Sequence, residues 1–314
     1  MRRLFISTLL CLLPMPAVAQ TARPSPPRHV TRPDLSTSSV AVGEWTRRLT
    51  VHDAKARAGA EADLVQGGPR SLPLLRRLLD DDSLQPRTLE IIRRIGPPAL
   101  PLLVDLLRDA RLSIRRSAAD ALIDLTPHTE AIQPALRRAL GDEDSDVAGD
   151  AARALGALGA KATPSVGALV RALAHEEPHV RIYAAEALAS VGPTAAAATP
   201  DLARAVGDPI PGVRWAACEA LASIGPAAAP AVPQLIDALG DEFLYVRIFA
   251  AGALGSIGPA ARAARDALRA AGTLIASPTA ASSRTRRRTI QTTEPRCAPS
   301  AIRIPISPIC RSTL

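Results

Sequence analysis

The sequence has very few aromatic residues. Phe, Trp and Tyr make up only 2% of its 314 residues, although 47% of them are hydrophobic. The apolar bulk is therefore Ala, Leu, Val and Ile. A β-sandwich would need β-branched and aromatic residues at every second position. This composition instead favours closely packed helices.

Cysteine is also scarce, and its spacing excludes the common cysteine-based sites. The four cysteines are Cys11, Cys218, Cys297 and Cys310. No two of them form the Cys-x-x-Cys pair that zinc, redox and haem-attachment sites use. Cys218 stands among alanines and leucines, and we interpret it as a buried core thiol.

The motifs of several enzyme classes are missing as well. There is no Gly-x-Ser-x-Gly, no phosphate-binding loop and no dinucleotide fingerprint. The histidines lie in different stretches without a shared helical face, so a metal cluster is not expected. Acidic runs such as Asp80-Asp81-Asp82 suit the turn before a helix. We therefore predict no catalytic residue, no metal site and no cofactor, and we expect that the chain is not an enzyme.

What the sequence does contain is one motif that recurs almost unchanged. The stretch from Val180 to Pro193 is repeated from Val213 to Pro226 and again from Val246 to Pro259. The three copies start at equal intervals along the chain. A fixed period of this length indicates a solenoid of stacked supersecondary units.

Each unit reads as a pair of helices. An opening helix carries leucines at three- and four-residue spacing, an acidic turn follows, and a second helix ends at Gly-Pro. Glycine suits the left-handed residue that ends a helix, and proline prevents its continuation. The opening helices are predicted at residues 72–79, 99–107, 132–140, 164–173, 200–206 and 230–239. The second helices are predicted to start near Leu84, Ile114, Val147, Val180, Val213 and Val246.

The first 19 residues have the order of a signal peptide. Arg2 and Arg3 precede a short apolar run, and Ala17-Val18-Ala19 forms a small-residue cleavage site before Gln20. We therefore expect a periplasmic or secreted protein without stable membrane insertion once the signal is removed.

Composition divides the rest of the chain. Residues 20–43 are rich in Pro, Ser, Thr and Arg and are predicted to be a disordered linker. Residues 44–68 are predicted to form an N-terminal capping helix, and residues 69–272 the solenoid. Residues 273–314 lack apolar density and are predicted to be a disordered basic tail.

The net charge of +8 comes from the two ends of the chain. Residues 44–272 hold 26 Lys and Arg against 28 Asp and Glu. No basic stripe is therefore available to follow phosphates along the solenoid, and we expect no nucleic acid as a partner.

The repeated pattern resembles a known family. Leucines before an Asp turn, followed by Val-Arg-x-x-Ala-Ala-x-Ala-Leu and Gly-Pro, resemble HEAT repeats of the short, phycobilisome lyase-like type over residues 69–272. The resemblance implies an all-α fold, a right-handed α-α superhelix of about six helix pairs, with the second helices on the concave side. It also implies a structural ladder of Asp and Arg six positions apart that bridges adjacent units. The ladder residues here are Asp109 and Arg115, Asp208 and Arg214, and Asp241 and Arg247.

The ladder is incomplete, and so is the match to one enzyme of the family. Ala148 stands where an Arg is expected, and His175 stands where an Asp is expected. HEAT-type deoxyhypusine hydroxylases bind two irons through His-Glu pairs that follow Val-Arg. The corresponding pairs here are Ile182-Tyr183, Trp215-Ala216 and Ile248-Phe249, which cannot ligate iron.

These same positions suggest a binding surface. Ile182, Trp215 and Ile248 share one repeat position, roughly opposite the buried stripe, and Tyr183 and Phe249 lie beside them. An apolar row on an otherwise exposed face usually marks a binding site. We predict an exported scaffold that binds a protein or peptide partner on the concave face. The alternatives are a lyase-like or hydroxylase-like enzyme or enzyme subunit and, third, a nucleic-acid-binding protein.

Overall fold

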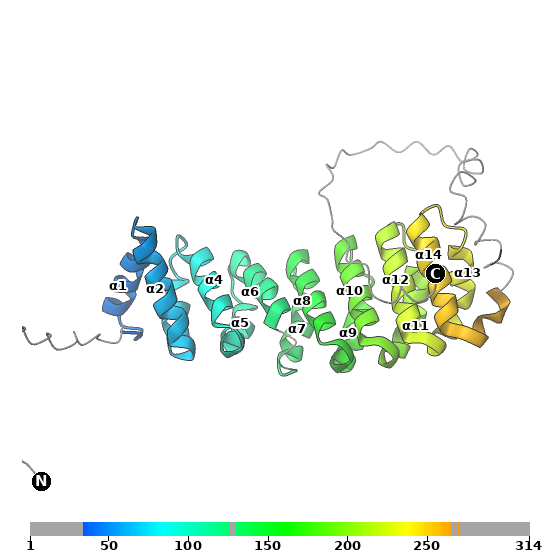
Figure 1. Cartoon of the computed structure of the whole chain (residues 1–314), viewed down its shortest axis with the longest axis horizontal. Helices are drawn as coiled ribbons and strands as arrows, with labels where there is room; N and C mark the ends of the chain where they lie inside the picture. Colours follow the sequence, from blue (N-terminus) through cyan, green and yellow to red (C-terminus); the bar gives the residue numbers. More distant parts are fainter. Residues whose placement is uncertain (1–33, 126–129, 265–268, 270–314) are drawn as a thin grey trace, which may run out of the picture.

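The computed structural model describes residues 34–125, 130–264 and 269, which form α-helices and short 3-10 helices without a strand. The helices follow one another in chain order along the long axis, and from α3 on they are arranged in pairs (Figure 1). The first helices of the six pairs are α3 (Leu72–Leu78), α5 (Leu100–Leu106), α7 (Gln133–Ala139), α9 (Val166–Ala172), α11 (Thr199–Ala205) and α13 (Val232–Ala238). The second helices are α4 (Gln85–Ile95), α6 (Leu112–Leu125), α8 (Ser145–Ala157), α10 (Pro178–Val191), α12 (Pro211–Ile224) and α14 (Leu244–Ile257).

Glycines end the repeated second helices as the sequence predicts. Gly192, Gly225 and Gly258 have φ of 73°, 73° and 72°. Each closes its helix by donating its backbone N–H to the carbonyl of a leucine four residues earlier. A 3-10 turn then leads from the Gly-Pro pair into the next unit. Local turn chemistry therefore sets the length of each unit.

One apolar core runs through the whole stack. Val180, Val213 and Val246 are fully buried, as are Leu188 and Leu221. Successive second helices pack against one another along much of their length, whereas successive first helices touch far less. The second helices therefore form the inner, concave layer of a right-handed α-α superhelix. The fold class predicted from the sequence is confirmed.

Small residues make this close packing feasible. A Cβ placed on Gly156 in α8 would lie 3.1 Å from the Cα of Ala187 in α10. Cys218 occupies such a small-residue position and is fully buried. Burial raises the pKa of the Cys218 thiol to about 12, which leaves it protonated at neutral pH.

The N-terminal cap differs from the prediction. It consists of two helices, α1 (Ser39–Thr50) and α2 (Ala54–Gly67), and not of one helix over residues 44–68. The linker predicted for residues 20–43 also ends early, because the Ser38 side chain caps α1 by accepting from the Ala41 N–H. Asp53 caps α2 in the same way through the Lys55 N–H. The serines that looked like linker residues are thus helix-start residues.

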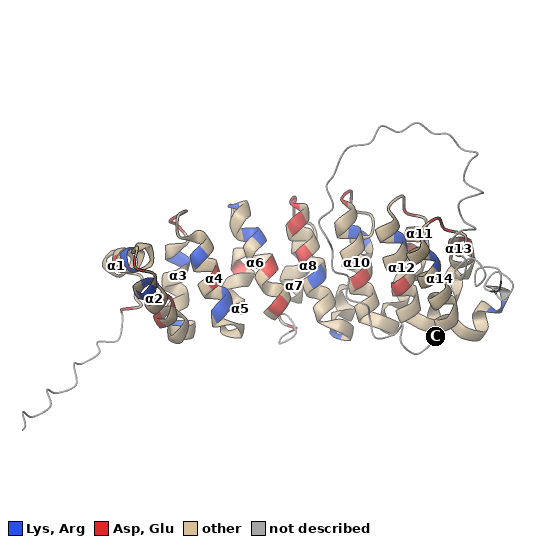
Figure 2. Cartoon of the chain, turned by 45° about the horizontal axis from the view of Figure 1, so that its top comes forward, with Lys and Arg blue, Asp and Glu red and all other residues tan. Residues whose placement is uncertain are grey.

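Arg and Asp side chains tie adjacent units together along the edge where the acidic turns line up, drawn red in Figure 2. Arg214 Nε and Nη2 donate to the two carboxylate oxygens of Asp241, at 2.8 and 3.0 Å. Its Nη1 donates to the backbone carbonyls of Asp208 and Pro209. Arg115 and Arg181 repeat this arrangement, each with the aspartate at the matching position of the next unit.

The side-chain pairs of the ladder thus join Arg of one unit to Asp of the next unit, as Arg214 joins Asp241. Across six positions the contact is from the Arg115, Arg214 or Arg247 guanidinium to a backbone carbonyl, at 2.8 to 3.1 Å. The carboxylate of Asp109 is held by Arg76 and Arg111. Ala148 and His175 occupy the positions that Arg and Asp hold in the other inter-unit pairs. This pair therefore lacks both of its charged side chains.

One helix in the described chain, Leu244–Arg262, is long and apolar enough to cross a membrane by length and composition. It consists of α14 together with the first part of the 3-10 turn Gly258–Ala264. Val246, Ala250 and Leu254 on this helix are buried within the stack. We interpret it as a core helix of the solenoid. The predicted signal peptide and the tail over 273–314 lie outside the described residues.

Candidate functional site

The inner face is built from equivalent positions on successive second helices. Residues three, four and seven apart lie on one face of a helix. In α10 these are His179, Ile182, Tyr183 and Glu186. The same positions recur one unit earlier in α8 and one unit later in α12. We call the surface formed by these positions on the second helices α6, α8, α10, α12 and α14 the inner face.

The predicted partner-binding residues lie together on the inner face of α10, α12 and α14. We call Ile182, Tyr183, Trp215, Ile248 and Phe249 the apolar row; all five are half-buried. The rings of Trp215 and Phe249 are 5.4 Å apart between centroids. Three successive units therefore present one continuous apolar strip.

The side chains of the apolar row are less exposed than the sequence suggests, because they pack on neighbouring helices. A Cβ on Gly212 would lie 2.9 Å from Cδ1 of Ile182, so the isoleucine side chain rests on the next helix. Tyr183 rests in the same way against Gly149 of the preceding helix. The second helices approach so closely that each large side chain covers part of its neighbour. The row is a ridge fixed across the helix boundaries.

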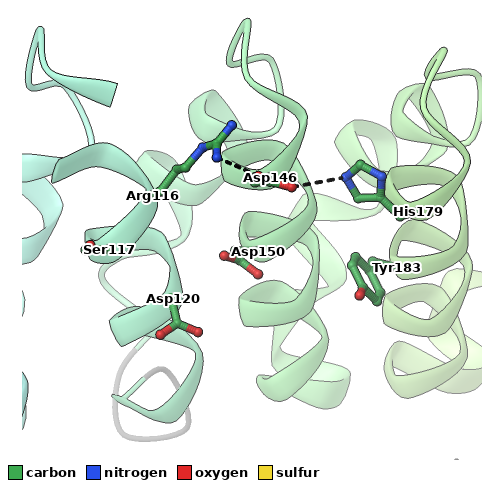
Figure 3. A pocket seen from close by; sticks show the side chains of 7 residues that line it. All are labelled: Arg116, Ser117, Asp120, Asp146, Asp150, His179 and Tyr183. Carbon is green, nitrogen blue, oxygen red and sulfur yellow. Dashed lines mark ion pairs between the residues drawn. The ribbon is translucent and has the colours of Figure 1, made fainter. Parts of the chain in front are cut away.

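Toward the N-terminus the inner face becomes polar (Figure 3). An open hollow of about 480 Å³ is lined by Arg116, Ser117, Asp120, Asp146, Asp150, His179 and Tyr183. Arg116 from α6 contacts Asp144 at 2.6 Å and Asp146 at 3.0 Å. His179 Nε2 lies 3.1 Å from the Ser145 carbonyl oxygen. The charged groups that line this hollow thus already have partners, either within the hollow or beside it.

Tyr183 is the boundary between the hollow and the apolar row. Its ring packs edge-on against His179, with centroids 6.2 Å apart. The guanidinium of Arg153 lies over the same ring at 5.4 Å. Arg153 also donates to Asp150 at 3.1 Å. Burial raises the pKa of Asp150, and the Arg153 guanidinium opposes that shift.

Two carboxylates next to the apolar row have no cation partner. Glu186 and Glu219 follow Ile182 and Trp215 by one helical turn and are half-buried. Within the described chain neither side chain forms a hydrogen bond or ion pair. Burial raises the pKa of Glu186 to about 6, and the Glu219 carboxylate adds to this shift. Burial raises the pKa of Glu219 as well.

Sequence reasoning missed these two glutamates and also an exposed apolar group at the edge of the face. The glutamates stand at the same position of successive units and face the same way as Trp215, which was the available signal. Phe243, Leu244 and Tyr245 are exposed at the start of α14. Tyr245 precedes Ile248 by three residues and therefore extends the apolar row toward the acidic turns.

Among the described residues, no group of three His, Cys, Asp or Glu side chains is arranged to hold a metal ion. The positions that follow Val-Arg are occupied by residues of the apolar row. His175 lies in the turn between α9 and α10, away from the inner face.

We expect Glu186→Gln to stabilise the fold at neutral pH. Because its pKa is raised, the folded chain binds more protons than the unfolded chain between pH 4.5 and about 6. The free energy of unfolding therefore falls as pH rises through this window. The neutral amide removes that penalty, a gain on the order of 1 kcal/mol after solvent screening. Urea denaturation at about pH 7.5 measures the gain, which should vanish near pH 4.

The control for this prediction is Glu177→Gln in the exposed turn before α10. That change should leave the free energy of unfolding within about 0.5 kcal/mol of the parent. A Glu186→Gln chain that is less stable than the parent at pH 7.5 would show that the carboxylate has a stabilising partner.

Comparison with known proteins agrees with this architecture. Residues 166–232, which run from α9 to the start of α13, match the family described as HEAT repeats. An engineered protein solved by the Northeast Structural Genomics Consortium is 22% identical, with a TM-score of 0.50 over 80% of this chain and 79% of that one. A designed armadillo repeat protein is 18% identical, with a TM-score of 0.43 over 69% of this chain and 100% of that one. A search among curated proteins gave no significant match.

The chain is thus a repeat solenoid, and a segment in its C-terminal half matches HEAT repeats. At 22% identity the likeness to the engineered protein shows the fold and nothing finer. The phycobilisome lyase-like type suggested by the sequence remains a prediction.

Proposed function

We propose that this protein is an exported, non-catalytic scaffold that binds a protein or peptide partner on its inner face. The observation that carries the proposal is the apolar row, which continues over three units and remains partly open to solvent. A partner that covers this strip would bury Trp215 and Phe249 at its centre. Large aromatic side chains at such positions dominate binding energy in many interfaces.

The two alternatives have weaker support. An enzyme of the hydroxylase type would need His-Glu pairs at the positions that Ile182 and Trp215 occupy. Nucleic-acid binding would need a basic stripe, and the inner face instead carries Asp120, Asp150 and Glu186. A scaffold requires neither feature.

We expect Trp215→Ala to weaken partner binding by about 2 kcal/mol or more while the chain stays folded. The indole is half-buried on the inner face and packs on Phe249, so its removal takes away contact area without opening the deep core. The measurement is capture of a crosslinked partner from a periplasmic extract, with circular dichroism on the same preparation.

The matched control is Arg171→Ala, an exposed position on α9 in the first-helix layer. Its capture should equal that of the parent chain. If Trp215→Ala folds and captures the partner as well as the parent does, the apolar row is not the binding surface.

Export is tested separately. We expect mass spectrometry of the protein recovered from its producing cell to find a mature chain that begins at Gln20. A soluble cytoplasmic chain that retains Met1 would contradict export without touching the binding proposal.

A further inference from the structure

Glu186 and Glu219 differ from every other half-buried carboxylate that the structure describes. The others accept a hydrogen bond or ion pair, in nearly every case from an arginine, as Asp208 does from Arg181 and Asp241 does from Arg214. Asp81, the exception, accepts from Ser83. The two glutamates lack such a partner although they lie on a surface that excludes part of the solvent. They leave a negative charge on the inner face that Arg153 offsets only in part and without an ion pair to either glutamate.

The positions of these glutamates connect that charge to the apolar row. Each glutamate lies one turn after a member of the row, Glu186 after Ile182 and Glu219 after Trp215. The equivalent position in the next unit is Gly252, around which a Cβ would meet open space. The charge is therefore confined to α10 and α12, and the apolar row continues past it to α14.

We propose that the partner supplies a basic, extended segment, with an arginine or lysine at Glu186 and Glu219 and apolar residues of the same segment on Trp215 and Ile248. This inference rests on the proposed function and adds the chemistry of the partner. A cation between two carboxylates relieves their mutual repulsion. A guanidinium also matches carboxylate geometry through paired hydrogen bonds.

The chain already uses the same recognition within itself. Arg153 places its guanidinium over the Tyr183 ring and donates to the Asp150 carboxylate. A partner arginine at Glu186 and Glu219 would meet the same combination one unit further on, with Trp215 as the ring. Its aliphatic stem would cover apolar surface while its charge reaches the carboxylates.

The distance between successive second helices determines how far apart the contacting residues of the partner segment must be. Packed helices are about 8–10 Å apart, and an extended chain advances about 3.3 Å per residue. A segment that crosses the second helices therefore meets a new unit about every three residues. The matching probe is a short fluorescent peptide in which arginine and leucine are separated by two alanines.

The test is fluorescence anisotropy of this peptide with the full chain, compared with a peptide in which glutamine replaces arginine. The Glu186→Gln, Glu219→Gln double variant should lose about tenfold affinity for the arginine peptide and none for the glutamine peptide. Trp215→Ala should weaken both peptides. Glu177→Gln, in the exposed turn, should change neither.

The pH dependence gives a second readout. Affinity for the arginine peptide should fall when pH is lowered through about 6, where Glu186 takes up a proton. The charged groups that face Glu186 are Arg153 from α8 and Glu219 from α12. The glutamine peptide should bind independently of pH over this range.

The outcomes separate the two proposals. If Trp215→Ala weakens both peptides but the double variant binds the arginine peptide normally, the inner face binds apolar segments and the basic partner is wrong. If Trp215→Ala changes neither peptide, the proposed function itself fails at this face. The chain also carries Arg284, Arg286, Arg287 and Arg288 outside the described residues. If replacing these four by alanine strengthens peptide binding, the chain's own arginines occupy the site, which would overturn the assignment to a partner.

Discussion

Leu221→Ala is expected to lower the free energy of unfolding by about 2–5 kcal/mol. Leu221 is fully buried in α12, which packs between α10 and α14. Removal of its side chain leaves a cavity that the surrounding alanines and valines are too short to fill. Urea denaturation followed by circular dichroism measures the loss.

The loss should spread beyond one unit. Neighbouring repeats are stabilised by their shared interfaces, so damage in α12 weakens both adjoining units. The matched control is Leu112→Ala, the same substitution at an exposed position at the start of α6, which should stay within about 0.5 kcal/mol of the parent. A loss below about 1 kcal/mol for Leu221→Ala would place residue 221 outside the core and refute the helical register.

That register shows how much a repeated sequence reveals. The constant period, the Gly-Pro ends and the spacing of Val213 and Leu221 predict the helix pairs and the buried stripe. These features act within one unit, where turn chemistry and helical periodicity are local. The start of α1 was missed because Ser38 serves equally well as a linker residue and as a helix cap.

What the sequence does not reveal are contacts whose partner belongs to another unit. The pairing of Arg214 with Asp241 depends on how one unit turns relative to the next. The pKa of Glu186 depends likewise on two residues of adjacent units, because Glu219 raises it and Arg153 lowers it. A helical wheel places Glu186 on the inner face but cannot tell whether a neighbour supplies a cation.

Arg214 and Arg247 occupy the same position in successive units of the ladder but differ in their contacts. Arg214 is almost buried and joins the backbone of its own turn to the carboxylate of Asp241. Arg247 makes the own-turn bonds to the carbonyls of Asp241 and Glu242, but its buried Nε has no hydrogen-bond partner among the residues that the structure describes. No aspartate of a following unit accepts from Arg247 in the part of the chain that the structure describes. Within that part, Arg247 therefore makes only the own-turn half of the contacts that Arg214 makes.

We expect Arg214→Ala to cost about 3 kcal/mol, because it strands the partly buried Asp241 carboxylate and two carbonyls together. Arg247→Ala should cost about 1 kcal/mol, since it removes only the bonds to its own turn. The difference between the two variants isolates the bond between units. Adding Asp241→Ala to Arg214→Ala should cost less than the sum of the single changes, because the two side chains share one interaction. Urea denaturation of the four variants tests this, and equal losses for Arg214→Ala and Arg247→Ala would mean that these arginines act only within their own turns.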